Sequence, residues 1–130
     1  MATYTGSCHC KAVTFEFDAP LDLTVINCNC SICTVKNNSH VIVPEANLRV
    51  LSGQNNLTEY RFNTMQAVHL FCKTCGVQPF YKPRSNPDGY GVIHSCIDTS
   101  PARSVSFESF DGRNWEAAFE SSDISKYSKS

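Results

Sequence analysis

Hydrophobic and polar residues alternate along much of this chain with the period of two that is typical of half-buried β-strands. In the segment 12–18, for example, Phe15 and Phe17 fall on one face, whereas Thr14 and Glu16 fall on the other. Shorter β-prone runs follow, most of them ended by turn-forming residues such as Gly, Pro and Asn. The pattern predicts further strands at residues 23–26, 40–43, 48–51, 57–62, 66–71, 78–82, 90–94 and 105–110.

Two local features refine the predicted sheets. The runs 57–62 and 66–71 are separated only by Asn63-Thr-Met65, so we expect them to pair as a hairpin. Pro79 lies inside the run 78–82. Because proline cannot donate a backbone hydrogen bond, it indicates that this strand lies at the edge of its sheet.

A helical pattern occurs only in the segment 113–119, where Trp115 and Phe119 are four residues apart and Asp-Gly comes just before. The residues after 120 are rich in Ser and Lys, and we expect them to be frayed. The sequence therefore predicts a single domain over residues 1–120, mostly β and antiparallel with one short C-terminal helix. A flexible C-terminal tail is expected over residues 121–130.

Charge and hydropathy narrow the class of protein only by exclusion. The net charge of −1 gives no electrostatic reason to expect a nucleic acid or an anionic membrane as a partner. No apolar run approaches the roughly 20 residues that span a bilayer. The composition therefore favours neither a nucleic-acid-binding nor a membrane-spanning protein.

Cysteine adds most to this picture, since the 130 residues include eight of them. The first residues have neither the charged nor the apolar region of a signal peptide. Closely spaced cysteines without a secretion signal point to metal binding rather than to disulfides. We therefore expect a reducing compartment, the cytoplasm or the nucleus.

Four of the cysteines form two pairs that suit one zinc ion. Cys72-Lys-Thr-Cys75-Gly76 is a zinc-knuckle pattern, in which two intervening residues let both thiols reach one ion and Gly76 permits a left-handed backbone. A knuckle supplies two ligands and needs another pair. The natural donor is Cys8-His-Cys10, just before the first predicted strand. Together the two pairs predict a closed, structural four-thiolate site.

Cys28, Cys30 and Cys33 remain as three thiols within six residues. Zinc takes four ligands, so three thiolates leave a position where a bound water or thiol has a lowered pKa. An open position would make the site catalytic, whereas a fourth protein ligand would make it structural. The sequence leaves this choice open, and the candidates for the fourth ligand are Cys96, His94, His40, His69 and a solvent molecule.

The histidines differ in how well they suit such a site. His69 alternates with apolar residues in its strand, and we interpret it as a core residue with satisfied hydrogen bonds rather than as a ligand. His40 and His94 each lie at the end of a predicted strand, and His94 is also close to Cys96. These two are therefore the better site candidates.

Three stretches in order along the chain, Gly6-Ser-Cys-His-Cys10, Cys28-Asn-Cys-Ser-Ile-Cys33 and Cys72-Lys-Thr-Cys-Gly76, resemble the motifs of the glutathione-dependent formaldehyde-activating enzyme family. The resemblance covers about residues 5–120. The stretch 80–87 and the run from Gly89 to Glu116 look closer still to the centromere protein V branch of that family.

This resemblance implies a fold similar to the β-tent, in which folded sheets are pinned by zinc. It also implies two zinc ions per chain, a structural ion on the four-thiolate set and a catalytic ion on the three-thiolate set, with Cys96 as a further catalytic candidate. The implied activity is that of a carbon–sulfur lyase. Its partners would be glutathione or a similar thiol and a small carbonyl compound, as when formaldehyde and glutathione form S-(hydroxymethyl)glutathione.

Two other functions stay open. One is a non-enzymatic, zinc-stabilised interaction module similar to centromere protein V. The other uses an open zinc position to hydrolyse a carbon–nitrogen bond. For the substrate, Arg84 is the best candidate to bind a carboxylate in a bidentate manner, unless the prolines around it simply shape an exposed loop. Further substrate-binding candidates are Asn86, His40 and His94.

Overall fold

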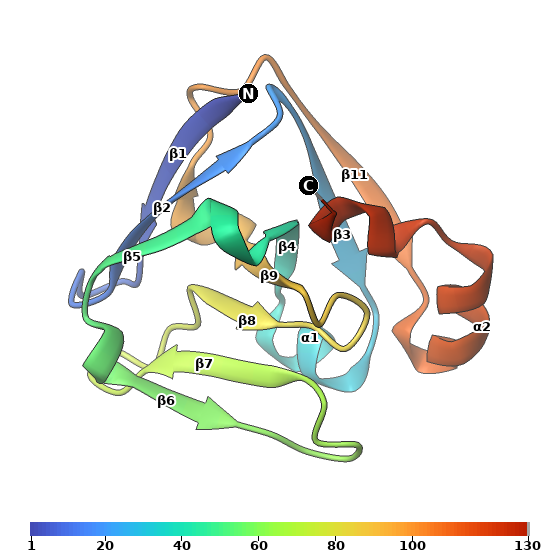
Figure 1. Ribbon diagram of the computed structural model, residues 1–130. Coiled ribbons are helices and arrows are strands. Elements are labelled where there is room, and N and C mark those ends of the chain that lie inside the picture. The colour runs from blue at the N-terminus through green and yellow to red at the C-terminus, as the bar shows by residue number, and fades with distance from the viewer. Residues whose placement is uncertain (130) are drawn as a thin grey trace.

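Two β-sheets lean against each other and form the body of the protein, as the slanting strands of Figure 1 show. The structure is a computed structural model that describes residues 1–129. The smaller sheet contains, in spatial order, β10 (Ile97–Asp98), β1 (Ala2–Ser7), β2 (Thr14–Ala19) and β5 (Leu48–Ser52). The larger sheet contains β11 (Ser104–Phe110), β3 (Asp22–Cys28), β4 (Ser39–Pro44), β9 (Gly89–Ile93), β8 (Phe80–Lys82), β7 (Val68–Cys72) and β6 (Leu57–Tyr60).

Helices are short and connect the strands or follow the last one. The α-helices are α1 (Ser31–Lys36), directly after β3, and α2 (Trp115–Ser121), after β11. Single 3-10 turns are η1 (Glu45–Asn47), η2 (Gln54–Asn56), η3 (His94–Cys96), η4 (Gly112–Asn114) and η5 (Ile124–Ser128). Within residues 1–129, no helix has the length and apolar character needed to cross a membrane.

The main hydrophobic core lies between the two sheets. Phe15 of the small sheet meets Phe80 of the large sheet edge to face, with ring centroids 5.3 Å apart. Tyr4 and Phe17 stack beside them at 5.3 Å, and all four side chains are buried. Burying one such side chain stabilises the fold by about 1.5–3 kcal/mol, so these rings account for much of the contact between the sheets.

A second, smaller core lies on the other face of the large sheet. Because side chains alternate along a strand, Ile26 and Ile42 face away from the main core and pack with Phe110 and Ile124. Ile124 belongs to η5, which together with α2 covers this face, as the C-terminal helices on the right of Figure 1 show.

Most predicted elements are found. The alternating segment forms β2, the β6–β7 hairpin pairs Leu57 with Cys72 and Tyr60 with His69, and α2 begins at Trp115. Neighbouring strands are antiparallel except for the parallel pair β11 and β3. The prediction of a mostly β, mainly antiparallel fold with one short C-terminal helix is confirmed.

Some local predictions are wrong. Pro79 does not mark an edge strand, because β8 lies between β9 and β7. The proline comes just before the first residue of β8, so its missing N–H interrupts no ladder, and its carbonyl accepts a hydrogen bond from Ile93 N–H at 2.9 Å. Within the segment 121–130, for which a flexible tail is expected, Ile124–Ser128 form η5, in which Ile124 and Ser128 are 3% and 4% exposed, and residue 130 lies outside the described residues.

We predict that Phe15→Ala lowers the free energy of unfolding by about 3–5 kcal/mol, because the large void between the sheets cannot collapse fully. Chemical denaturation followed by circular dichroism measures this change. Phe107→Ala is the matched control, since Phe107 is 58% exposed on β11 and its removal should cost little. Equal losses in the two variants would contradict the assignment of the core.

Candidate active site

Four cysteines form a cluster that joins the two sheets. Cys8 and Cys10 lie in the β1–β2 turn of the small sheet, and Cys72 and Cys75 lie at the β7–β8 turn of the large sheet. Their sulfur atoms all lie within 4.8 Å of one another. Gly76 follows in a left-handed conformation, with φ of +76°, as the knuckle pattern predicts.

The surroundings of this cluster favour thiolates. Asn56 Nδ2 donates a hydrogen bond to Cys72 Sγ at 3.2 Å, and the N–H of Val13 donates to Cys8 Sγ at 3.4 Å. Hydrogen bonds from the backbone N–H groups of Cys75 and Thr74 lower the pKa of Cys72 to about 6. Zinc is bound by thiolates rather than thiols, so the donor set and its hydrogen bonds fit a zinc ion.

The other cluster, of Cys28, Cys30 and Cys33, is built around the end of β3 and the start of α1. Cys28 is the last residue of β3, Cys30 is the N-cap of α1, and Cys33 lies one helical turn later. The helical turn brings Cys33 back beside the other two, and the three sulfur atoms lie within 4.8 Å of one another. These three thiols also fit a zinc ion, through three of its four positions.

No fourth side chain completes this group in the described part of the chain: no other cysteine, histidine or carboxylate lies within the same 4.8 Å limit. Cys96, on η3, is directed elsewhere, and its thiol contacts the carbonyl of Gln78 at 3.7 Å. The structure thus brings together the three cysteines predicted for this cluster without a fourth cysteine, histidine or carboxylate beside them in the described residues.

The three thiols have different proton affinities. Hydrogen bonds from the Cys28 and Cys33 thiols, helped by the backbone N–H groups of Cys33 and Ile32, lower the pKa of Cys30. The same close contacts raise the pKa of Cys33, because a thiol that donates to a neighbouring thiolate holds its proton. The shared hydrogen bonds and the backbone N–H groups at the start of α1 therefore favour a thiolate within this cluster.

Asn29 fixes the cysteine loop to the end of β11. Its backbone N–H donates to the Phe110 carbonyl at 3.2 Å, and its side-chain amide donates to Asp111 Oδ1 at 2.9 Å. The N–H of Arg113 donates back to Asn29 Oδ1 at 3.1 Å. Gly112 lies between these contacts, and a Cβ there would be only 2.6 Å from Cys28 Sγ and from Cys30 Cβ.

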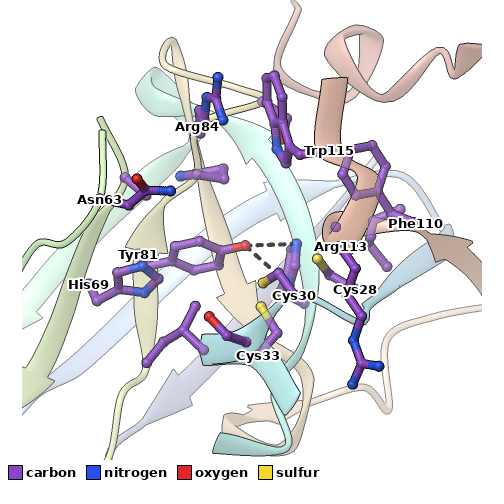
Figure 2. Close-up of a pocket in the computed structure, with 18 of the residues that line it drawn as sticks. Cys28, Cys30, Cys33, Asn63, His69, Tyr81, Arg84, Phe110, Arg113 and Trp115 are labelled. Atoms are coloured by element: carbon purple, nitrogen blue, oxygen red, sulfur yellow. Dashed lines mark hydrogen bonds between the residues drawn. The ribbon is translucent and has the colours of Figure 1, made fainter. Parts of the chain in front are cut away.

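The three cysteines line one part of a cavity of about 370 Å³. Figure 2 shows them at one end, with Arg84 and Trp115 at the other. The wall between is largely apolar and comes from distant parts of the chain: Ile26, Ile32, Phe62, Phe110 and Ile124. Such a partly enclosed, apolar space with a few polar groups is typical of small-molecule sites.

His40 and Tyr81 form a buried hydrogen-bonded pair beside the cysteines. The Tyr81 hydroxyl and His40 Nε2 are 3.0 Å apart, and Figure 2 shows Tyr81 pointing toward Cys30. Burial lowers the pKa of His40 to about 4 and raises the pKa of Tyr81 well above its usual value. Both groups are therefore uncharged near pH 7.

The predicted substrate-binding residues divide into two groups. His40 and Arg84 line the cavity. Asn86 does not line it and is fully buried, where its amide donates to the Ile124 carbonyl at 3.0 Å. His94 is also outside the cavity lining and contacts the ring of Phe107.

His69 differs from its interpretation as a core residue with satisfied hydrogen bonds. It is buried, at 3% exposure, and stacks on Tyr81, but Nε2 has no hydrogen-bond partner in the described part of the chain. It also lines the cavity. Alternation along the strand indicates burial but cannot show which buried face meets a cavity.

Sequence reasoning missed several residues that line the cavity. Tyr81 and Phe62 read as ordinary alternating strand residues, and Trp115 as the apolar face of a helix. No local signal distinguishes such residues from core, because the cavity forms only when segments far apart in the sequence meet.

Comparisons with known proteins agree with this site. A model of the family described as glutathione-dependent formaldehyde-activating enzyme matches residues 3–112. Among solved structures, the crystal structure of a Rhodobacter sphaeroides protein is similar, with 33% sequence identity and a TM-score of 0.66. That match covers 80% of this chain and 99% of the other.

Fold and site together define a small β protein with two cysteine clusters suited to metal, one joining the two sheets and one open to a cavity. Within that class, the family match over most of the chain decides to which family the protein belongs. The chain belongs to the glutathione-dependent formaldehyde-activating enzyme family. The expected resemblance to this family is therefore confirmed.

We predict that Gly112→Ala weakens metal binding at the three-cysteine cluster by about 10- to 100-fold, the range typical of changes just outside a metal's ligands. The added methyl group would displace Cys28 or Cys30. Titration against a chromophoric chelator measures the affinity. Glu120→Ala, at an exposed position of α2, is the control, and equal affinities in both variants would contradict the close packing at Gly112.

Proposed function

We propose that this protein is a zinc-dependent carbon–sulfur lyase of the formaldehyde-activating type, which forms or cleaves the adduct of a thiol such as glutathione with a small carbonyl compound. The observation that carries the proposal is the placing of the Cys28, Cys30 and Cys33 thiols at a cavity with no fourth protein ligand in the described residues. The family match supports it.

Two zinc ions per chain follow from the same proposal. The four-cysteine cluster would hold a structural ion, and the three-cysteine cluster would hold one that the substrate can reach. An ion held by three thiolates has a position where a thiol would be bound with a lowered pKa. Cysteines that hold metal rather than form disulfides suit a reducing compartment, and we place the protein in the cytoplasm or the nucleus.

The residues of the cavity would position the two reactants. Burial in an apolar wall excludes water, and the neutral Tyr81–His40 pair offers a hydrogen bond beside the cysteines. Arg84, at the other end, would bind a carboxylate of the thiol substrate. Holding the two reactants close together removes much of the entropic cost of joining them.

The reaction balances without any further reactant. In the forward direction the thiol sulfur bonds to the carbonyl carbon, the carbon–oxygen π bond breaks, and the thiol proton ends on the new hydroxyl oxygen. Cleavage reverses each step. A hydrogen-bond donor near the carbonyl oxygen assists in both directions, and the Tyr81 hydroxyl in the cavity lining is the candidate for this role.

A second candidate function is a non-enzymatic interaction module with two structural ions. The likeness of the stretch 80–116 to centromere protein V favours this candidate, and such a module requires no open coordination position. A third is hydrolysis of a carbon–nitrogen bond at the same open position. Thiol binding distinguishes both from the lyase.

We predict that Cys72→Ser and Cys30→Ser affect the protein in different ways. Cys72→Ser removes a ligand that joins the two sheets and should unfold the protein at ordinary temperature, because a structural zinc contributes directly to folding. Cys30→Ser should leave a folded protein that contains about one zinc fewer and has no thiol-dependent turnover. Thermal melts and elemental analysis test both expectations, and melts that coincide would argue for two structural ions.

Glutathione binding is the direct test of the proposed function. Calorimetric titration of the zinc-loaded protein should give saturable binding that is lost in Cys30→Ser. Turnover should be followed as exchange between free formaldehyde and the thiol adduct by NMR, because the uncatalysed reaction also gives the adduct. If a protein that holds both ions does not bind the thiol, the lyase proposal is wrong.

A further inference from the structure

The last part of the chain contributes to the cavity although it lies beyond the family match, which ends at residue 112. Arg113, Trp115 and Ile124 all line the cavity. The similar solved structure is covered over 99% of its length by only 80% of this chain, so about a fifth of this chain has no counterpart there. We define the segment 113–128 as the C-terminal wall.

Trp115 is the centre of this wall. The guanidinium carbon of Arg84 lies 3.8 Å from the centroid of the indole ring, and Phe119 stacks on the same ring with centroids 4.9 Å apart and an interplanar angle of 7°. The Arg84 guanidinium and the Phe119 ring are both too close to the indole to share one of its faces, so the indole lies between them. Figure 2 shows the Arg84–Trp115 pair at the end of the cavity away from the cysteines.

The loop that carries Arg84 is bound to the wall at three alternate residues. Arg84 stacks on Trp115, the Asn86 amide donates to the carbonyl of Ile124 at 3.0 Å and to Ser128 Oγ at 2.8 Å, and Asp88 Oδ1 accepts a hydrogen bond from Ser128 Oγ. Asn86 is 0% exposed. Loop and wall therefore form one unit.

The charge of Arg84 is only weakly compensated. Its nearest carboxylate is Glu116, at 3.9 Å, and the side chain of Glu116 is 84% exposed. An ion pair this exposed contributes little. Arg84 Nε is buried without a hydrogen-bond partner within residues 1–129, and the stacked indole covers one face of the guanidinium. The planar group is thus held in place with donors left to bind an anion.

We propose that the C-terminal wall determines the specificity of this site: Trp115 holds Arg84 in place, and the pair binds the negatively charged, non-reacting end of the thiol substrate. Arg84 touches the substrate, whereas Trp115 is a positioning residue that acts through Arg84. The proposal rests on the proposed function for its thiol, and it adds that the enzyme prefers anionic thiols over neutral ones.

Trp115 also supplies the means of testing the site without any turnover, because it is the one tryptophan of the sequence. The probe is S-methylglutathione, which keeps the carboxylates of glutathione but has no free thiol. We expect its binding to the zinc-loaded protein to change the tryptophan fluorescence in a saturable way. Arg84→Gln should raise the dissociation constant about 10-fold or more.

The matched control is Arg103→Gln. Arg103 pairs with Asp22 at the surface, away from the cavity lining, so this variant loses the same charge and should bind S-methylglutathione like the wild type. Trp115→Phe keeps a flat aromatic face, and Trp115→Ala removes it. Calorimetry should therefore give weaker binding in Trp115→Ala than in Trp115→Phe, with thermal melts to confirm that both are folded.

Substrate preference provides the second measurement. The ratio of kcat/KM for glutathione to that for the neutral thiol 2-mercaptoethanol should fall about 10-fold in Arg84→Gln and Trp115→Ala and stay constant in Arg103→Gln. A merely structural role of Trp115 would lower both rates together and leave the ratio unchanged. An unchanged ratio in folded variants would overturn the proposal.

The outcomes separate this proposal from the proposed function. Turnover of glutathione without Arg84-dependent preference or fluorescence change would overturn the wall proposal and leave the lyase standing. Saturable, Arg84-dependent binding of S-methylglutathione by a protein with no thiol-dependent turnover would support the wall and remove the lyase. No binding of S-methylglutathione at millimolar concentration would overturn the wall.

Discussion

The rest of this structure depends on four cysteine thiols that come together from the turns of two different sheets. Cys8 and Cys10 come from the small sheet and Cys72 and Cys75 from the large one, and their sulfur atoms lie within 4.8 Å of one another. Four thiols brought so close repel one another once ionised, unless a cation is present. A metal ion at this cluster would therefore act on the same interface as the packing of Phe15 against Phe80.

The two clusters use the same donor atom in opposite ways. The first takes its cysteines from turns far apart in the sequence, and so it fixes the relation of the sheets. The second takes Cys28, Cys30 and Cys33 from one strand end and one helical turn, and so it needs no distant partner for its ligands. At the second cluster, distant segments of the chain supply the walls of the cavity rather than the thiols. The four-cysteine cluster is therefore closed, and the three-cysteine cluster is accessible.

Much of this could be read from the sequence, for reasons that are local. Cysteine spacing reports which thiols can reach one ion, and strict alternation around Phe15 and Phe17 reports a strand. The first strand was missed because only Tyr4 of its side chains is buried, and α1 because six residues make fewer than two helical turns. Asn86 and Arg84 looked alike in a proline-flanked loop, yet only Arg84 lines the cavity, since the direction of each side chain depends on contacts with residues some 40 positions later.

The parallel pairing of β11 with β3 has a consequence for the order in which the molecule is assembled. Its register sets Phe110 opposite Cys28, and partners in this pair are about 82 residues apart in sequence. Contacts between such distant residues form late during folding, because a long loop must close first. During synthesis on the ribosome, the knuckle and the small sheet can meet before β11 has emerged, whereas the loop of Cys28 to Cys33 reaches its final shape only afterwards. The accessible cluster thus matures only after β11 has paired with β3.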